Sequence, residues 1–131
     1  MYYFAYGSNL SFKQMSERCP KSKPRFKAIL PNYRLIFTGW SRKLRGGVAG
    51  IKKVKDEKVV GGVYEVSEGC LMSLDRHEGS LYVRLNVVVF TEDGDPIEAI
   101  THIKEGKLEE TQPSQEYLTI MRQGFKDWKI A

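Results

Sequence analysis

The sequence predicts an α+β protein, built as a small mixed, mostly antiparallel β-barrel with two or three flanking helices. The chain has 131 residues, which is the usual size of one domain. Several short runs rich in β-branched and aromatic residues are separated by turn signals, a pattern typical of small barrels and highly curved sheets. Helical signals occur in only a few segments. We therefore expect a single domain spanning residues 1–131.

The expected strands are short and punctuated by turn residues. The first is an aromatic run that ends at Gly7. We expect a hairpin turn at Lys55-Asp56-Glu57-Lys58 and another at Asp93-Gly94, a strong hairpin signal. The strand candidates are Tyr2–Tyr6, Arg25–Leu30, Tyr33–Thr38, Gly47–Val54, Val59–Val66, Tyr82–Thr91 and Pro96–Lys104.

Two helices are predicted from their capping residues. Ser11 followed by Gln14 fits a capping box and predicts a helix over Phe12–Arg18. Ser67 is a good N-cap for a helix over Glu68–Glu78, which Gly79 would end as a left-handed C-cap.

The last element is the clearest helix. Pro113 and Ser114 mark its start, and Gly124 lies on its apolar stripe, where it predicts close backbone packing. The stripe has helical spacing and consists of Tyr117, Ile120, Met121, Phe125 and Trp128.

Composition predicts the compartment. No run approaches the roughly 18 apolar residues that a membrane span needs, and no secretory signal is recognisable, so we expect a cytoplasmic protein with no membrane partner. Cys19 and Cys70 lie far apart in the sequence and show no metal-ligand spacing. We expect them to be reduced thiols, buried or half-buried.

The net charge of +5 conceals two opposed halves. Residues 1–58 carry +11 and residues 59–131 carry −6. A half this basic is compatible with a nucleic-acid footprint, attraction of small anionic substrates, or a solvated face. Composition alone does not choose among them.

Glu78 is the most informative single position. Leu71, Leu74 and Glu78 follow one another at helical spacing, so Glu78 continues the core-facing stripe at the helix C-terminus. The helix dipole and any desolvation there would raise the pKa of the carboxyl, which suits general acid/base chemistry near neutrality. The alternative is a fraying last turn, with Glu78 in solvent or paired to Arg84.

The second informative segment is the loop from Tyr6 to Leu10, which leaves a strand and enters a capped helix. Its residues are Tyr6, Gly7, Ser8, Asn9 and Leu10. Successive amide N–H groups ahead of a helix can cradle a phosphate, a carboxylate or a developing oxyanion. A turn without function has the same composition. His102 is expected to be an ordinary structural histidine, and the P-loop, dinucleotide-binding and zinc-protease motifs are absent.

Taken together, two blocks of sequence resemble the gamma-glutamylcyclotransferase-like family. They are Tyr3-Phe4-Ala5-Tyr6-Gly7-Ser8-Asn9-Leu10 and Leu74-Asp75-Arg76-His77-Glu78-Gly79. Tyr82-Val83-Arg84, and Pro113-Ser114 with Tyr117 and Gly124, add support in family order. The resemblance implies a small mixed barrel with flanking helices. It also implies an enzyme that cyclises a gamma-glutamyl compound to 5-oxoproline and releases an amine.

The resemblance assigns roles to individual residues. Glu78 would be the catalytic acid/base, Tyr6 to Leu10 the substrate-binding loop, and Tyr82 and Tyr117 further substrate contacts. The chemistry requires no metal or organic cofactor, because the α-amine of the substrate is the nucleophile. Fold membership does not determine which gamma-glutamyl conjugate is the substrate.

Two other classes of function remain open. One is a catalytically silent family member. The other is a binding module whose basic residues, such as Arg42, Lys43 and Arg45, contact nucleic acid or an acidic protein. A nucleic-acid partner is the less expected outcome, and the sequence leaves the oligomeric state open.

Overall fold

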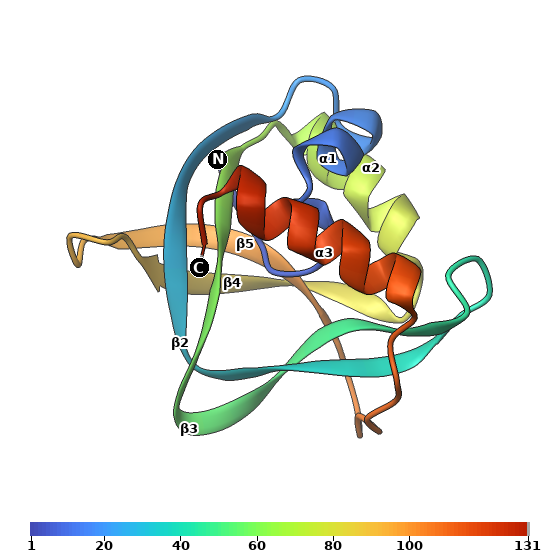
Figure 1. Cartoon of the computed structure of the whole chain (residues 1–131). Helices are drawn as coiled ribbons and strands as arrows, with labels where there is room; N and C mark the ends of the chain where they lie inside the picture. The colour runs from blue at the N-terminus through green and yellow to red at the C-terminus, as the bar shows by residue number, and fades with distance from the viewer. Residues whose placement is uncertain (131) are drawn as a thin grey trace.

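The structure is a computed structural model that describes residues 1–130 (Figure 1). Three α-helices and one short 3-10 helix accompany five strands. In chain order the elements are β1 (Tyr2–Ala5), η1 (Ser8–Leu10), α1 (Phe12–Arg18), β2 (Lys23–Ser41), β3 (Gly46–Glu65), α2 (Glu68–Glu78), β4 (Tyr82–Phe90), β5 (Pro96–Lys104) and α3 (Gln115–Asp127).

The five strands form a closed barrel in the order β1-β3-β2-β4-β5. Four of the neighbouring pairs are antiparallel, whereas β1 and β5 run parallel and complete the closure. The predicted mixed, mostly antiparallel barrel with flanking helices is therefore confirmed. In Figure 1, α3 crosses one face of the barrel, with α1 and α2 beside it.

The prediction of a hairpin turn at Lys55–Lys58 is wrong. Two long strands, β2 and β3, replace the four short ones expected, and their pairing continues from Pro31↔Lys58 to Tyr33↔Lys53. The extra residues form an irregularity in which Asn32 and Asp56 both have positive φ and the Asp56 N–H donates to Asn32 Oδ1 at 3.1 Å. Polar residues there bend the paired strands instead of reversing the chain, as bulges do in curved sheets.

Two apolar clusters divide the core. Residues of all five strands, with Tyr117 and Met121 of α3, form the cluster inside the barrel. A second cluster lies under the helices and includes Leu10, Leu71 and Leu74. Strand β1 serves both, because alternate residues of a strand point to opposite faces. Phe4 belongs to the first cluster and Tyr3 to the second.

The predicted helices have the caps read from the sequence. The side chains of Ser11, Ser67 and Ser114 each accept a backbone N–H three residues ahead, as expected for N-caps. Gly79 follows α2 with a φ of 87°, a conformation that favours glycine. Within residues 1–130, no helix has the length and apolarity needed to cross a membrane.

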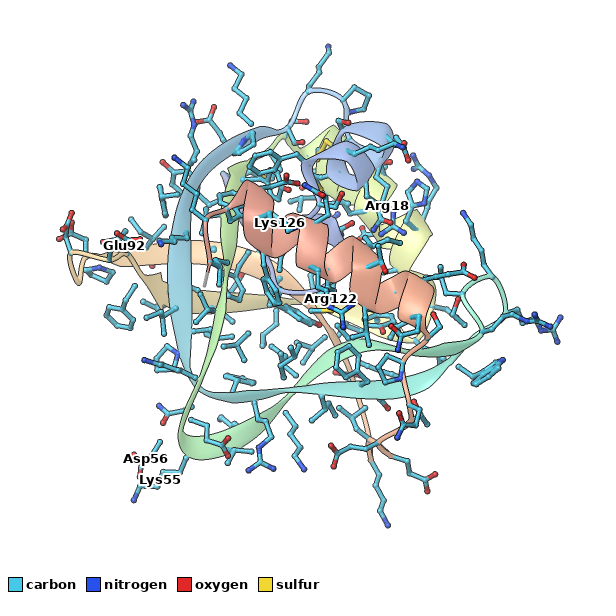
Figure 2. The ribbon with its side chains drawn as sticks, viewed as in Figure 1. Arg18, Lys55, Asp56, Glu92, Arg122 and Lys126 are labelled. Atoms are coloured by element: carbon cyan, nitrogen blue, oxygen red, sulfur yellow. A yellow bond between two sulfur atoms is a disulfide. The ribbon has the colours of Figure 1, made fainter. Side chains whose placement is uncertain are left out.

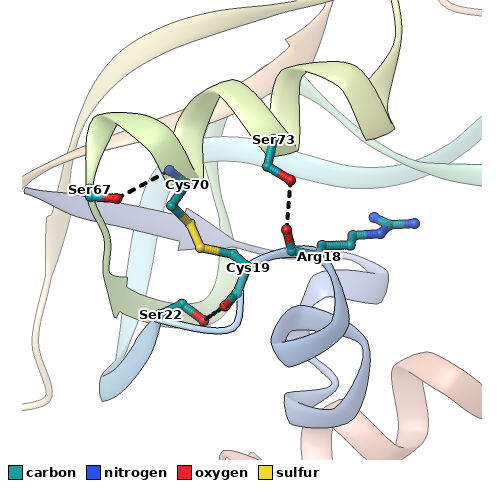
Figure 3. The surroundings of a disulfide bond; sticks show 6 residues. All are labelled: Arg18, Cys19, Ser22, Ser67, Cys70 and Ser73. Carbon is teal, nitrogen blue, oxygen red and sulfur yellow. Dashed lines mark hydrogen bonds between the residues drawn. A yellow bond between two sulfur atoms is a disulfide. The ribbon is translucent and has the colours of Figure 1, made fainter.

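The structure differs from the prediction made for the two cysteines. Cys19 and Cys70 form a disulfide that links the end of α1 to the first turn of α2 (Figure 3). The neighbouring Ser73 hydroxyl donates to the Arg18 carbonyl at 2.6 Å and ties the same two helices together. The expectation of reduced thiols is therefore wrong, because a separation of 51 residues conceals their proximity. The cysteines no longer support a reducing compartment.

Gly124 should be intolerant of a side chain. A Cβ at this position would lie 2.5 Å from Leu10 Cβ and 2.8 Å from the Ser11 nitrogen, which confirms the close packing of α3 on η1. We expect Gly124→Ala to lower the free energy of unfolding by about 1–3 kcal/mol in a urea titration. Gly69→Ala is the matched control, because its Cβ meets only Ser67 Oγ at 3.8 Å and alanine favours a helix. Equal effects of the two substitutions would contradict this packing.

The disulfide should stabilise the fold. Loop-closure entropy for a separation of 51 residues corresponds to at most about 4 kcal/mol. We expect reductant to lower the urea midpoint of the wild-type protein and to leave that of the Cys19→Ser/Cys70→Ser double variant unchanged. Free thiols on both cysteines of non-reduced protein, measured by alkylation and mass spectrometry, would contradict the bond.

Candidate functional site

A pocket of about 560 Å³ lies where η1, the β2–β3 turn and the end of α2 meet the barrel. Most of the residues singled out from the sequence line it. Those lining residues are Tyr6, Gly7, Ser8, Asn9, Glu78, Tyr82 and Tyr117, and Leu10 is absent from the lining. The pocket draws on both the basic and the acidic halves of the chain, because Arg18 and Lys43 line it together with Glu78.

Glu78 is the last residue of α2 and reaches the pocket because of the packing of that helix. Leu71 and Leu74 are fully buried, so the same helix face continues to Glu78 one turn later. Glu78 is partly buried, and the Asn9 side-chain amide donates to its Oε1 at 3.5 Å. Arg84 forms its ion pairs with Asp75 and Glu68, so the alternative of a Glu78–Arg84 pair is wrong.

The pKa of the Glu78 carboxyl is raised above its ordinary value. Burial is the largest cause, because removal from water disfavours the charged form. The positive charges of His102 and Arg18 act in the opposite direction and do not cancel the burial. A carboxyl in this state can both accept and return a proton nearer to neutral pH than an exposed one can.

The loop over Gly7–Asn9 is hydrogen-bonded to the barrel and to the end of α3. The hydroxyl of Tyr64 donates to the Asn9 carbonyl at 2.7 Å, and the Trp128 indole donates to the Leu10 carbonyl at 2.9 Å. Within residues 1–130, the N–H groups of Gly7 and Asn9 have no acceptor. The loop therefore directs the Asn9 and Leu10 carbonyls toward Tyr64 and Trp128, and the N–H groups of Gly7 and Asn9 stay unpaired within the described residues.

The Tyr117 side chain of α3 contacts the loop through its hydroxyl group. Its hydroxyl oxygen accepts the backbone N–H of Ser8 at 3.2 Å and that of Ala49 at 3.1 Å. Because a phenol oxygen has two lone pairs, its own proton is left to donate. Gly7 is required nearby, since a Cβ there would lie 2.9 Å from the Tyr117 oxygen.

Leu10 is not placed with the other predicted site residues. Its side chain is fully buried in the cluster under the helices, and its N–H donates to the Gly7 carbonyl. The loop turns into η1 at this point, which directs Leu10 toward the core. Tyr82, in contrast, is half-buried in the pocket wall, where burial and the nearby charge of Glu78 raise its pKa.

Three pocket residues were not identified from the sequence. Arg18 donates from Nη1 to Asn9 Oδ1 at 2.9 Å, and Figure 2 shows its side chain beside α2. His102 and Tyr3 are buried and lie within hydrogen-bond distance of one another at 3.1 Å. All three reach the pocket through tertiary packing, for which the local pattern carries no signal.

The described residues offer no site for a metal ion. Across residues 1–130, no three side chains of the types His, Cys, Asp and Glu are grouped in a way that could hold one. The polar groups of the pocket are hydroxyls, amides, the imidazoles of His77 and His102, the side chains of Arg18, Lys43 and Lys104, and the Glu78 carboxylate. Such groups can form hydrogen bonds and ion pairs with anionic and amide-bearing organic molecules.

The chain is similar to known gamma-glutamylcyclotransferases. The family described as "Gamma-glutamyl cyclotransferase, AIG2-like" matches residues 3–128. The proteins named gamma-glutamylcyclotransferase from Homo sapiens and Bos taurus are 32% and 31% identical to it over 132 residues, covering 95% of this chain and 70% of each relative. A solved structure named gamma-glutamyl cyclotransferase superposes with a TM-score of 0.92 at 30% identity, covering 97% of this chain and 79% of that chain.

The barrel also occurs in more distant proteins. The allophanate hydrolase of Kluyveromyces lactis has a TM-score of 0.64 to this chain at 13% identity, which shows a shared fold alone. The family match, by contrast, extends over nearly all of the sequence. The chain therefore belongs to the gamma-glutamyl cyclotransferase, AIG2-like family.

Proposed function

We propose that the protein cyclises a gamma-glutamyl amine or gamma-glutamyl amino acid to 5-oxoproline and releases the free amine, with Glu78 as general acid and base. One observation carries the proposal: Glu78 and the loop over Gly7–Asn9 line one pocket. A separation of 69 positions between Asn9 and Glu78 makes this meeting a property of the fold.

Proton transfer is assigned to Glu78. The neutral α-amine nitrogen of the substrate attacks the γ-carbonyl carbon while the Glu78 carboxylate accepts one of its protons. A new C–N bond closes the five-membered ring and leaves a tetrahedral oxyanion. The protonated Glu78 then donates to the departing nitrogen, the original C–N bond breaks, and the carbonyl re-forms. The raised pKa of Glu78 supports both roles.

Anion binding is assigned to the backbone N–H groups of the loop. The N–H groups of Gly7 and Asn9, free within residues 1–130, are available to a substrate carboxylate or to the oxyanion. Removing one such donor typically costs roughly 3 kcal/mol of transition-state stabilisation. Holding the substrate folded also favours the reaction, because ring closure is intramolecular.

Substituting Glu78 tests the chemistry directly. Glutamine keeps the size of the side chain but cannot accept a proton, so Glu78→Gln should reduce 5-oxoproline formation by about 100-fold or more. The assay incubates protein with several gamma-glutamyl dipeptides and gamma-glutamyl amines and measures 5-oxoproline by mass spectrometry. Glu105→Gln is the control, because Glu105 is exposed and lies outside the pocket lining.

Two results would refute the proposal. Full activity in the Glu78→Gln variant would exclude Glu78 as the acid/base. No product from any compound with the wild-type protein would exclude the reaction itself. Salt-sensitive binding of nucleic acid that is unaffected by Glu78→Gln would then favour the binding-module alternative.

Tyr117→Phe tests the loop. The ring would keep its edge contact with Phe37, at a centroid distance of 6.1 Å, while the hydroxyl that bridges Ser8 and Ala49 is lost. We expect kcat/KM to fall by about 10- to 100-fold and stability to fall by about 1–3 kcal/mol, because two N–H groups lose their acceptor. Tyr33→Phe, in a tyrosine outside the pocket lining, should change neither quantity appreciably.

A further inference from the structure

His102 is a buried titratable group that the mechanism above does not use. It lies on β5, is 2% exposed, and contributes to the pocket lining. Both ring nitrogens are occupied: Nδ1 lies 3.1 Å from the Tyr3 hydroxyl, and Nε2 lies 2.7 Å from Asp75 Oδ1. A histidine held at both nitrogens beside a candidate acid/base has a fixed orientation and a defined set of proton positions.

Asp75 determines that Nε2 of His102 carries a hydrogen. It lies in α2 one turn before Glu78, and Arg84 pairs with it at 2.7 Å. The hydrogen bond from Arg84 is the largest cause that lowers the pKa of Asp75 to about 2, and His102 lowers it further. Asp75 is therefore ionised at neutral pH and acts only as an acceptor, so Nε2 of His102 carries a hydrogen.

The other nitrogen is coupled to Tyr3, which is 3% exposed and also lines the pocket. Burial and the charge of Glu78 hold the Tyr3 pKa well above its ordinary value, so the phenol keeps its proton. When His102 is neutral, Nδ1 accepts the Tyr3 O–H. When His102 is protonated, Nδ1–H donates instead, and the Tyr3 O–H turns away from the imidazole to donate elsewhere.

We propose that His102 is a positioning residue for the reaction at Glu78: fixed by Asp75, it sets the direction in which Tyr3 donates and places a titratable positive charge beside the Glu78 carboxylate. The inference rests on the proposed cyclotransferase function. It assigns a task to Asp75 and Arg84 as well, because their ion pair holds the imidazole in place.

The sign of the expected pH effect follows from the groups that face Glu78. The positive charge of His102 lowers the pKa of Glu78 and opposes the effect of burial. Without the positive charge of His102, Glu78 becomes a carboxylate only at higher pH. The acid limb of the kcat-against-pH profile therefore moves to higher pH. The other titratable or charged groups that influence or line this region are Tyr3 on β1, Tyr6 directly after β1, Arg18 on α1, Lys43 in the β2–β3 turn, His77 on α2, Tyr82 on β4, Lys104 on β5 and Tyr117 on α3.

The test uses His102→Gln, with His102→Asn as a second neutral replacement. Both amide side chains retain hydrogen-bonding groups but cannot carry a charge. We expect both variants to move the acid limb of kcat, and the Glu78 pKa measured by carbon-13 NMR of its carboxyl, upward by about one pH unit. Above the limb, kcat should stay within about tenfold of the wild-type value. Asp95→Asn, in the exposed β4–β5 turn, is the control and should move neither quantity.

Each outcome separates the inference from the proposed function. An unchanged Glu78 pKa in folded His102→Gln would overturn the inference whatever the activity. Thermal melting shows whether that variant is folded, and if it is not, His102→Asn decides by the same criterion. A shifted pKa in protein that forms no 5-oxoproline would overturn the proposed function and with it the positioning role.

Discussion

Closure of the barrel by β1 is the constraint on which the site depends. This short strand pairs with β3 on one side and with β5 on the other, and both of its faces are buried. The chain leaves β1 directly into Gly7 and η1, so the closing strand also positions the loop. The Tyr6 hydroxyl donates to the His102 carbonyl at 2.7 Å, which fixes the end of β1 against β5. The precision of the loop thus derives from the stability of the barrel.

Desolvation and nearby positive charge have opposite effects on the pKa of Glu78. Burial raises the pKa of Glu78, whereas Arg18 and His102 oppose that effect, and burial is the larger of the two. Under the proposed function, the positive charge of Arg18 in the pocket also attracts an anionic substrate. The +11 and −6 halves of the sequence meet here, because the loop and Arg18 come from the first half and Glu78 from the second. Pocket charge and carboxyl basicity are therefore set by the same packing of α1 against α2.

The sequence predicted correctly those elements that are determined by interactions between neighbouring residues. The bounds of α1 and α2 and the serine caps follow from short-range hydrogen bonds, so they could be read from neighbouring residues. The bulge at Asn32 and Asp56 could not, because Lys55–Lys58 has the composition of a turn and only pairing across the sheet shows that it bends. The disulfide between Cys19 and Cys70 is likewise a long-range contact.

The site was predictable in part for the same reason. Helical spacing placed Glu78 on the core-facing side of α2, and the Gly-Ser-Asn composition marked a tight loop. That the two meet was implied by the family resemblance and not by either pattern. Leu10 was expected in the loop but packs in the core, and the partners of His102 come from α2 and β1.

The central claim is that Glu78 and the loop amides act on the same bound molecule. An NMR titration with 5-oxoproline, the proposed product, tests it most directly by following the Gly7 and Asn9 amide signals together with the Glu78 carboxyl carbon. The account predicts that all three signals shift and saturate with one dissociation constant. Shifts confined to the loop or to Glu78, or different dissociation constants for the two, would contradict it.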